Sequence, residues 1–273
     1  MILAKTCTIL VALLLVAGCS EAEPTKADRA AAATVPGAPP GGAADILAKG
    51  ASASNVKESG ALVEFAYAYP REAAQVPELA HYLDTDREVK REALLAAAER
   101  DKAAAEKGNF PYHPHSHLQK WLRVTSTPRF LSLSAEIETY MGGAHGMTSF
   151  ETLLWDRNKR RTLKPLDLFS SSEAFDAAIR DDFCARIKQA KAAKGIHSPD
   201  EPDSVFAKCP PASAQTVWLG SSDGHYLDRM TVAIGPYEVG PFAEGSYKIN
   251  IPVTSALVRA VKPEFARDFL PLN

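Results

Sequence analysis

The chain has 273 residues, with 31 basic and 33 acidic side chains, a formal net charge of −2 at pH 7, and 46% hydrophobic residues. This near balance of charge argues against a nucleic-acid partner, which would call for a basic surface. After its first 56 residues the chain retains roughly 215, which is enough for one compact domain or two small joined ones.

Residues 1–18 have the features of a lipoprotein signal peptide. The apolar run at 8–17 is too short to cross a bilayer, and it closes on the sequence VAGC, which is typical of a lipobox. We therefore predict lipid attachment at Cys19 and a membrane-anchored protein on the periplasmic side of the cell envelope. Ser20 slightly favours the outer membrane. The alternative is an ordinary secretory signal followed by a coincidental cysteine.

Residues 19–56 are rich in Ala, Pro, Gly and short polar residues, including PGAPPGGAAD at 36–45. Such a composition buries too little apolar surface to offset the entropy of ordering the chain. We predict that this segment, beginning at the lipidated N-terminus, is a disordered linker.

The next segments alternate between strand and helix patterns. Apolar and polar residues alternate at 61–70, which predicts a strand that ends at Pro70. Residues 77–107 are mostly good helix formers, so we expect one or two helices there, with Gly108 in the C-cap position.

Two further strands are predicted at 129–141 and 148–155. In the first, the apolar residues Leu131, Leu133 and Ala135 alternate with polar ones, as in a strand with one buried face. A glycine-rich stretch that contains His145 connects the two strands.

A helix is predicted to start at a capping box formed by Ser170 and Glu173 and to end near Gly195. Large apolar residues recur at every fourth position along it. Strands follow at 217–219, 227–234 and 247–253, and a last helix starts near Ser255.

This order of elements predicts an α+β fold, with a mainly antiparallel sheet and helices packed on one of its faces. We divide it into two joined subdomains, an N-terminal part at 57–160 and a C-terminal part at 161–273.

Cys184 and Cys209 remain after Cys7 is lost with the signal peptide and Cys19 is lipidated. In an oxidising compartment we predict that they form a disulfide. A two-cysteine metal site is the alternative, but no CxxC spacing or nearby histidine supports it.

Two stretches resemble chemical sites. His113, His115 and His117 alternate by two, and such a cluster could hold Zn²⁺ or Cu²⁺ if a further ligand converged on it. Pro114 disturbs a regular strand here, so an adventitious cluster is the favoured interpretation. Residues 220–224 match the G-x-S-x-G pattern of hydrolases, but a strand follows where the nucleophile elbow needs a helix, so we predict a polar turn.

Five residues are candidates for ligand binding: Tyr140, His145, Tyr237, Phe242 and Tyr247. The glycines at 142–146 could supply positive φ in a hairpin connection, or they could make room for a ligand beside His145. The three aromatic residues in the segment 235–247 offer rigid area of the kind that anchors protein or sugar interfaces. The alternative is that they close the end of the sheet as core.

Three motifs in order carry a family resemblance: YMGGAHG at 140–146, TLKPLDLF at 162–169 and PYEVGPFAEG at 236–245. Together they resemble the extracytoplasmic module shared by RsiV-type anti-sigma factors and the N-terminal region of PdaC-type peptidoglycan deacetylases. The resemblance covers residues 57–271. It implies an α+β module in two joined parts, located near peptidoglycan, and in the anti-sigma branch it implies recognition of lysozyme.

The sequence departs from both branches. We recognise neither a sigma-binding segment nor a deacetylase domain, so no catalytic residue, metal or cofactor is carried over. We expect a non-catalytic envelope lipoprotein that recognises lysozyme or peptidoglycan. The alternatives are a structural lipoprotein without a discrete ligand and a metal-dependent hydrolase that would use His113, His117 and His145.

Overall fold

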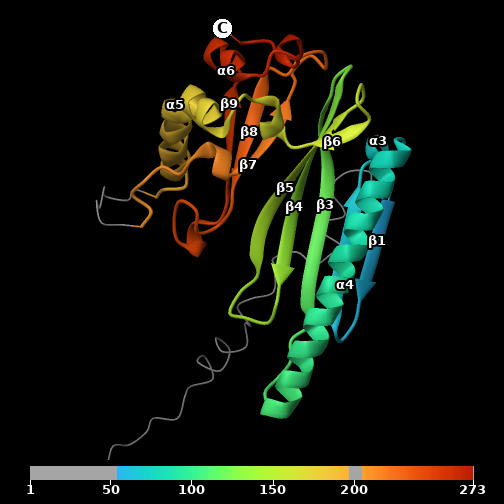
Figure 1. Cartoon of the computed structure of the whole chain (residues 1–273). Coiled ribbons are helices and arrows are strands. Elements are labelled where there is room, and N and C mark those ends of the chain that lie inside the picture. The colour runs from blue at the N-terminus through green and yellow to red at the C-terminus, as the bar shows by residue number, and fades with distance from the viewer. Residues whose placement is uncertain (1–53, 197–204, 273) are drawn as a thin grey trace, which may run out of the picture. The chain divides into compact units, whose positions relative to one another are not determined.

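The computed structural model describes residues 54–196 and 205–272, which belong to one compact unit of the chain (Figure 1). The predicted signal peptide, the lipidation site Cys19 and most of the predicted linker lie outside these residues. The α+β prediction is confirmed, although the strands form two sheets of six and three strands rather than one. No helix in the described part of the chain is long and apolar enough to cross a membrane.

The six-stranded sheet has its strands in the order of the chain. All neighbouring strands are antiparallel except β2 and β3, which are parallel. Its members are β1 (Ser54–Ser59), β2 (Val63–Tyr69), β3 (His115–Ser126), β4 (Phe130–Tyr140), β5 (Met147–Asp156) and β6 (Arg161–Leu163).

Strand β1 corrects the predicted end of the linker, because it begins at Ser54 rather than after residue 56. Its residues alternate between half-buried and exposed and include one large apolar side chain, Val56, so the composition carries little strand signal. Pairing with β2 along its whole length, from Ser54 opposite Tyr69 to Ser59 opposite Glu64, holds it in the sheet.

A short helix α3 (Arg71–Ala74) and the long helix α4 (Pro77–Gly108) connect the parallel strands β2 and β3, which need such a crossover. Figure 1 shows α4 lying along the six-stranded sheet. Its residues Leu79, Leu83 and Leu94 pack with the buried side chains of the sheet. The cap is Asn109, which adopts the left-handed conformation with φ 53°, so the predicted cap at Gly108 is wrong by one residue.

The second sheet is antiparallel and contains β7 (Thr216–Gly220), β8 (Arg229–Ile234) and β9 (Tyr247–Pro252). Helix α5 (Ser172–Ala193) packs against it, with the predicted row Phe175, Ile179, Phe183 and Ile187 fully buried. Helix α5 is capped by Ser171, whose side chain accepts a hydrogen bond from the amide of Ala174, rather than by Ser170. The remaining elements are α6 (Ser255–Ala260) and the 3₁₀-helices η1 (Pro165–Leu168), η2 (Ala212–Ala214), η3 (Phe242–Glu244) and η4 (Ala266–Asp268).

The two sheets pack on each other, which explains why β4 is buried on both faces. Ser132 is fully buried although we expected it to face solvent. The reason is that β7 covers this side of the sheet: Trp218 donates from its Nε1 to the carbonyl of Glu151 at 2.9 Å, and the Thr216 hydroxyl donates to the carbonyl of Phe150 at 3.1 Å.

The predicted division at residues 160 and 161 falls inside a hairpin. Strand β6, which we assigned to the C-terminal part, pairs with β5 and completes the six-stranded sheet. Phe130 and Leu154, from the N-terminal part, belong to the same core as α5 and the three-stranded sheet.

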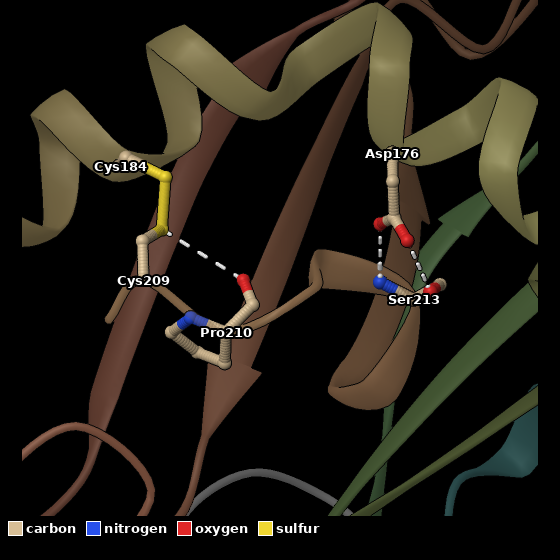
Figure 2. Close-up of a disulfide and its surroundings, with 5 residues drawn as sticks. All are labelled: Asp176, Cys184, Cys209, Pro210 and Ser213. Carbon is tan, nitrogen blue, oxygen red and sulfur yellow. Dashed lines mark hydrogen bonds between the residues drawn. A yellow bond between two sulfur atoms is a disulfide. The ribbon is translucent and has the colours of Figure 1, made fainter. Parts of the chain in front are cut away.

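The predicted disulfide between Cys184 and Cys209 is present, with an S–S distance of 2.05 Å (Figure 2). It joins α5 to the segment that precedes β7. One helical face further along, Asp176 accepts hydrogen bonds from the amide of Ser213 at 2.8 Å and from its hydroxyl at 2.5 Å. These two connections fix the segment 209–213 along α5.

Candidate functional site

Two of the motifs identified in the sequence meet in space. The His145 ring, in the β4–β5 connection, stacks on the Phe242 ring with 3.7 Å between ring centroids and 18° between planes. Tyr237 completes the group, with its hydroxyl 3.2 Å from His145 Nε2 and its ring centroid 5.7 Å from that of Phe242. We call these three residues the aromatic cluster.

The β4–β5 connection fixes the orientation of His145. Gly142 has a φ of 80°, which favours glycine, and the Tyr140 hydroxyl donates to the carbonyl of Gly143 at 3.1 Å. His145 Nδ1 lies 2.9 Å from the carbonyl of Gly146. A carbonyl only accepts, so Nδ1 carries the proton, and in the neutral ring Nε2 accepts from Tyr237.

Tyr237 adopts a φ of 69° although it is not glycine, and its side chain is 47% exposed. Such a conformation costs on the order of 1 kcal/mol for a bulky residue. Burial of the ring does not offset this cost, so the structure holds an exposed tyrosine in a strained position beside His145.

Helix α5 holds the loop that carries Phe242. The Lys194 ammonium donates to the carbonyls of Glu244 at 2.7 Å and Ser246 at 2.9 Å, and it lies over the Tyr247 ring at 3.7 Å. Lys191 pairs with the Glu244 carboxylate at 3.4 Å, and the Tyr247 hydroxyl donates to the same carboxylate at 2.7 Å. Burial, followed by the contact with Glu244, raises the pKa of Tyr247, so its hydroxyl keeps its proton.

The predicted candidates therefore divide into two groups. His145, Tyr237 and Phe242 come together at the surface, whereas Tyr140 is 9% exposed and Tyr247 is 3% exposed. The latter two lie inside, where they position the two loops rather than offer a binding face. Met141 and Met147, which flank the β4–β5 connection and are both exposed, were not among the candidates. They add flexible apolar area beside the cluster.

The other sequence motifs do not form a catalytic or metal site among the described residues. His113 precedes β3, while His115 Nε2 lies 3.3 Å from Asp101 and His117 Nε2 lies 2.9 Å from Gln119 Oε1. No group of three potential metal ligands occurs in the described ranges. The segment 220–224 connects two strands, as predicted, so it lacks the geometry of a nucleophile elbow.

A polar network beneath α4 was not predicted. The Lys90 ammonium contacts Asp86 at 3.0 Å, Gln119 at 3.0 Å and Glu151 at 2.8 Å, and the Tyr67 hydroxyl donates to Asp86 at 2.7 Å. Its members come from a helix and three strands, and Lys90 is 61 residues from Glu151, so spacing could not reveal it. The only sequence signal was the strand alternation that places His117 and Gln119 on one face.

Comparison with known proteins places this geometry in a family context. Residues 56–148 match the family model described as "Deacetylase PdaC". A solved DUF3298 protein from Bacteroides fragilis is similar in fold, with 15% identity, a TM-score of 0.53, and coverage of 79% of this chain and 94% of that one. A DUF3298 protein from Pseudomonas aeruginosa PAO1 has 17% identity, a TM-score of 0.47, and coverage of 77% and 94%. No curated protein matches the chain.

The matched segment begins in β1 and ends in β5, so it includes the β4–β5 connection but not the segment 235–247. The resemblance predicted from the motifs is thus confirmed: the chain contains a PdaC-type domain at residues 56–148, in a fold that it shares with a DUF3298 protein.

Proposed function

We propose that the protein is a cell-envelope lipoprotein whose folded part binds a lysozyme-type muramidase without catalysing a reaction. The observation that carries this proposal is the aromatic cluster, which brings together two sequence motifs 92 residues apart as an exposed, rigidly supported surface. Rigid aromatic area of this kind is what protein interfaces use as anchors.

The choice of partner rests on the family resemblance. The PdaC-type domain at 56–148 includes the loop that carries His145, and lysozyme recognition is implied by the anti-sigma branch of the resembling proteins. The cluster itself contains no nucleophile and no paired acid and base, so it supports binding rather than hydrolysis. In this proposal the lipid on Cys19 and the linker hold the binding surface on the periplasmic side of the envelope.

The first experiment is calorimetric titration of the chain from residue 20 onward with a c-type lysozyme, in moderate salt. Salt matters because a basic enzyme and an acidic protein attract each other non-specifically. We expect saturable binding at micromolar affinity or better. Absence of heat together with an unchanged melting temperature would remove lysozyme as the partner. Peptidoglycan fragments would then be titrated, and failure of both would leave a structural lipoprotein.

A matched pair of variants ties the binding to the aromatic cluster. Tyr237→Ala should weaken lysozyme binding at least tenfold, since central aromatic anchors typically contribute 2 kcal/mol or more. Tyr82→Ala is the control, because Tyr82 is 48% exposed but lies on α4. Equal affinities for the two variants would show that binding uses another surface.

Lipid attachment needs its own test. We expect the protein made in a bacterial host that processes lipoproteins to fractionate with membranes and to gain the mass of a diacylglyceryl group and an acyl chain at Cys19. Cys19→Ser should release it into the soluble fraction. A wild-type protein that is cleaved but carries no lipid would establish the ordinary secretory signal instead.

A further inference from the structure

A pocket of about 200 Å³ opens between α4 and the strands β3 and β4. It lies on the face of the six-stranded sheet that α4 covers, whereas the three-stranded sheet packs on the opposite face. The residues that line it are Lys90, Ala93, Leu94, Ser116, His117, Thr139 and Met141. Side chains alternate along a strand, so Ser116 directs its hydroxyl to the other face of β3.

The pocket has no free cation to attract an anion. The three protons of the Lys90 ammonium have three acceptors, on Asp86, Gln119 and Glu151, at 2.8–3.0 Å. Only the aliphatic part of Lys90 is left to line the pocket. A carboxylate or phosphate, which can only accept hydrogen bonds, therefore finds no donor on this side chain.

The polar network determines which nitrogen of His117 carries the proton. The Gln119 amide nitrogen donates to the Glu151 carboxylate at 3.0 Å, so its oxygen must be the atom that faces Lys90 and His117. That oxygen only accepts, and His117 Nε2 lies 2.9 Å from it. Nε2 is therefore protonated.

The second ring nitrogen of His117 is then a hydrogen-bond acceptor. Burial lowers the pKa of His117; Lys90 acts in the same direction, while the hydrogen bond to Gln119 and the charges of Glu151 and Asp86 oppose it. The ring is thus neutral at pH 7, and Nδ1 keeps its lone pair. Among the described residues Nδ1 has no hydrogen-bond partner, and the Thr139 hydroxyl, which donates to the carbonyl of Met147 at 3.4 Å, also has lone pairs to spare.

From this arrangement we propose that the pocket binds a small neutral N-acyl amine. Its N–H would donate to His117 Nδ1, and its short acyl group would lie against Ala93 and Leu94. Acceptors without free donors select an N–H group over a carboxylate, and the volume suits a few non-hydrogen atoms. Such a group occurs both in N-acetylated sugars and in peptide amides.

The test uses two probes of nearly equal shape, N-methylacetamide and methyl acetate, titrated into the ¹⁵N-labelled protein and followed by NMR. Only the first has an N–H. We expect saturable shifts at β3, β4 and α4 with N-methylacetamide, and binding of methyl acetate roughly fivefold weaker, which is the loss typical of one hydrogen bond. Equal shifts for the two probes, or no shifts at these elements, would overturn the proposal.

Variants separate the pocket from the rest of α4. Ala93→Phe should fill the pocket and abolish the shifts, while Ala96→Phe, also at an exposed position of α4 but outside the lining, should leave them unchanged. His117→Phe keeps a ring to stack on Phe65 but has no acceptor, so it should make the two probes bind equally. Persistence of the preference for N-methylacetamide in His117→Phe would assign the acceptor elsewhere.

The premise and the source of the group are tested in the same samples. The ¹⁵N shifts of the His117 ring should show a neutral imidazole protonated at Nε2, and an Nδ1–H tautomer would contradict the proposal. N-acetylglucosamine and N-acetylalaninamide then distinguish a sugar from a peptide source. We expect at least one of them to bind more tightly than N-methylacetamide, and weaker binding by both would show that the pocket does not serve N-acyl ligands.

Discussion

At the scale of single residues, the most informative position is Tyr237, where the backbone conformation and the exposed ring can be tested separately. A φ of 69° suits glycine far better than any residue with a Cβ. We expect Tyr237→Gly to be more stable than Tyr237→Ala by about 1 kcal/mol, because both lose the ring and only glycine relieves the strain. Urea unfolding followed by circular dichroism measures the difference, and equal stabilities would mean that the loop relaxes around alanine.

Arg129 connects the six-stranded sheet to the C-terminal segment. Its guanidinium contacts Asp156, whose side chain is fully buried, at 3.0 Å and Asp268 at 2.8 Å, and it lies over the Phe265 ring at 4.7 Å. Burial acts to raise the pKa of Asp156, but the hydrogen bond and charge of Arg129 and the amides of Lys159 and Asn158 hold it below its usual range. Asp268 behaves oppositely, since burial raises its pKa despite the same arginine.

The lowered pKa of Asp156 predicts a loss of stability in acid. A carboxyl group with a lower pKa in the folded state stabilises the protein above its unfolded pKa of about 3.9, and this contribution disappears as the pH falls through the folded value. Asp156→Asn should cost about 3 kcal/mol at pH 7 and much less at pH 2 to 3, by urea unfolding. Asp181→Asn, at an exposed position of α5, should change little at either pH. A cost for Asp156→Asn that is independent of pH would refute the ion pair as its cause.

Residue-scale prediction from the sequence succeeded where the residues stand out by type. The glycines around His145 and the aromatics of the segment 235–247 attracted attention through composition, and three of them meet. It failed to assign Tyr140 and Tyr247 to the interior, because burial depends on what packs above a residue. Arg129 and Lys90 were missed because their partners lie far along the chain.

At the scale of elements, the disulfide fixes α5 to the segment before β7. The two cysteines are 25 residues apart in sequence. On the chain-entropy model, replacing both with alanine should lower the free energy of unfolding by about 3 kcal/mol. Reduction of the wild-type protein with dithiothreitol should have an effect of similar size. A double-alanine variant as stable as the oxidised protein would show that the contacts of α5 hold this segment without the bond.

Gly240 controls the loop that carries Phe242. A Cβ at this position would collide with the Glu244 carboxylate, which Lys191 and the Tyr247 hydroxyl hold in place. We expect Gly240→Ala to displace Glu244, to lower stability by about 1 to 2 kcal/mol, and to weaken partner binding although residue 240 is buried. Gly60→Ala, with open space around its Cβ, is the control. Unchanged stability and binding in Gly240→Ala would mean that Glu244 does not position the loop.

Most elements could be predicted because their patterns are local. The period of the strands and the row of apolar residues along α5 appear in the structure. Strand β1 was missed because its stability comes from pairing with β2 rather than from its own composition. The cap of α4 was displaced by one residue because Asn109 also tolerates the left-handed conformation.

At the scale of the whole molecule, the two sheets share a core, since Phe130 and Leu154 of the larger sheet pack with α5 and the smaller one. We therefore expect the two sheets to unfold together. Native-state hydrogen exchange in increasing urea should show the most protected amides of β4 and β8 converging on one free energy. A distinctly lower value in β8 would establish two independent units.

The sequence predicted the α+β class, but it did not predict that there are two sheets. An alternating strand indicates one buried face, and nothing local in β4 signals that β7 covers the other. The hydrogen bonds from Trp218 and Thr216 that join the sheets go to backbone carbonyls, which carry no information about sequence. Packing between distant strands therefore had to come from the structure.

The register of β1 has a mechanical consequence. The chain enters the sheet at Ser54, which lies opposite Tyr69, whereas the β4–β5 connection lies at the other end of the strands, beyond the pair Ser116 and Tyr140. If the N-terminal side is anchored and a bound partner is pulled away, the force runs along the strands. It would load all the β1–β2 hydrogen bonds at once, in shear, rather than opening them one by one. Forced unfolding between residue 54 and residue 145 should therefore need a higher force than pulling β1 apart from β2 at Ser54 and Tyr69.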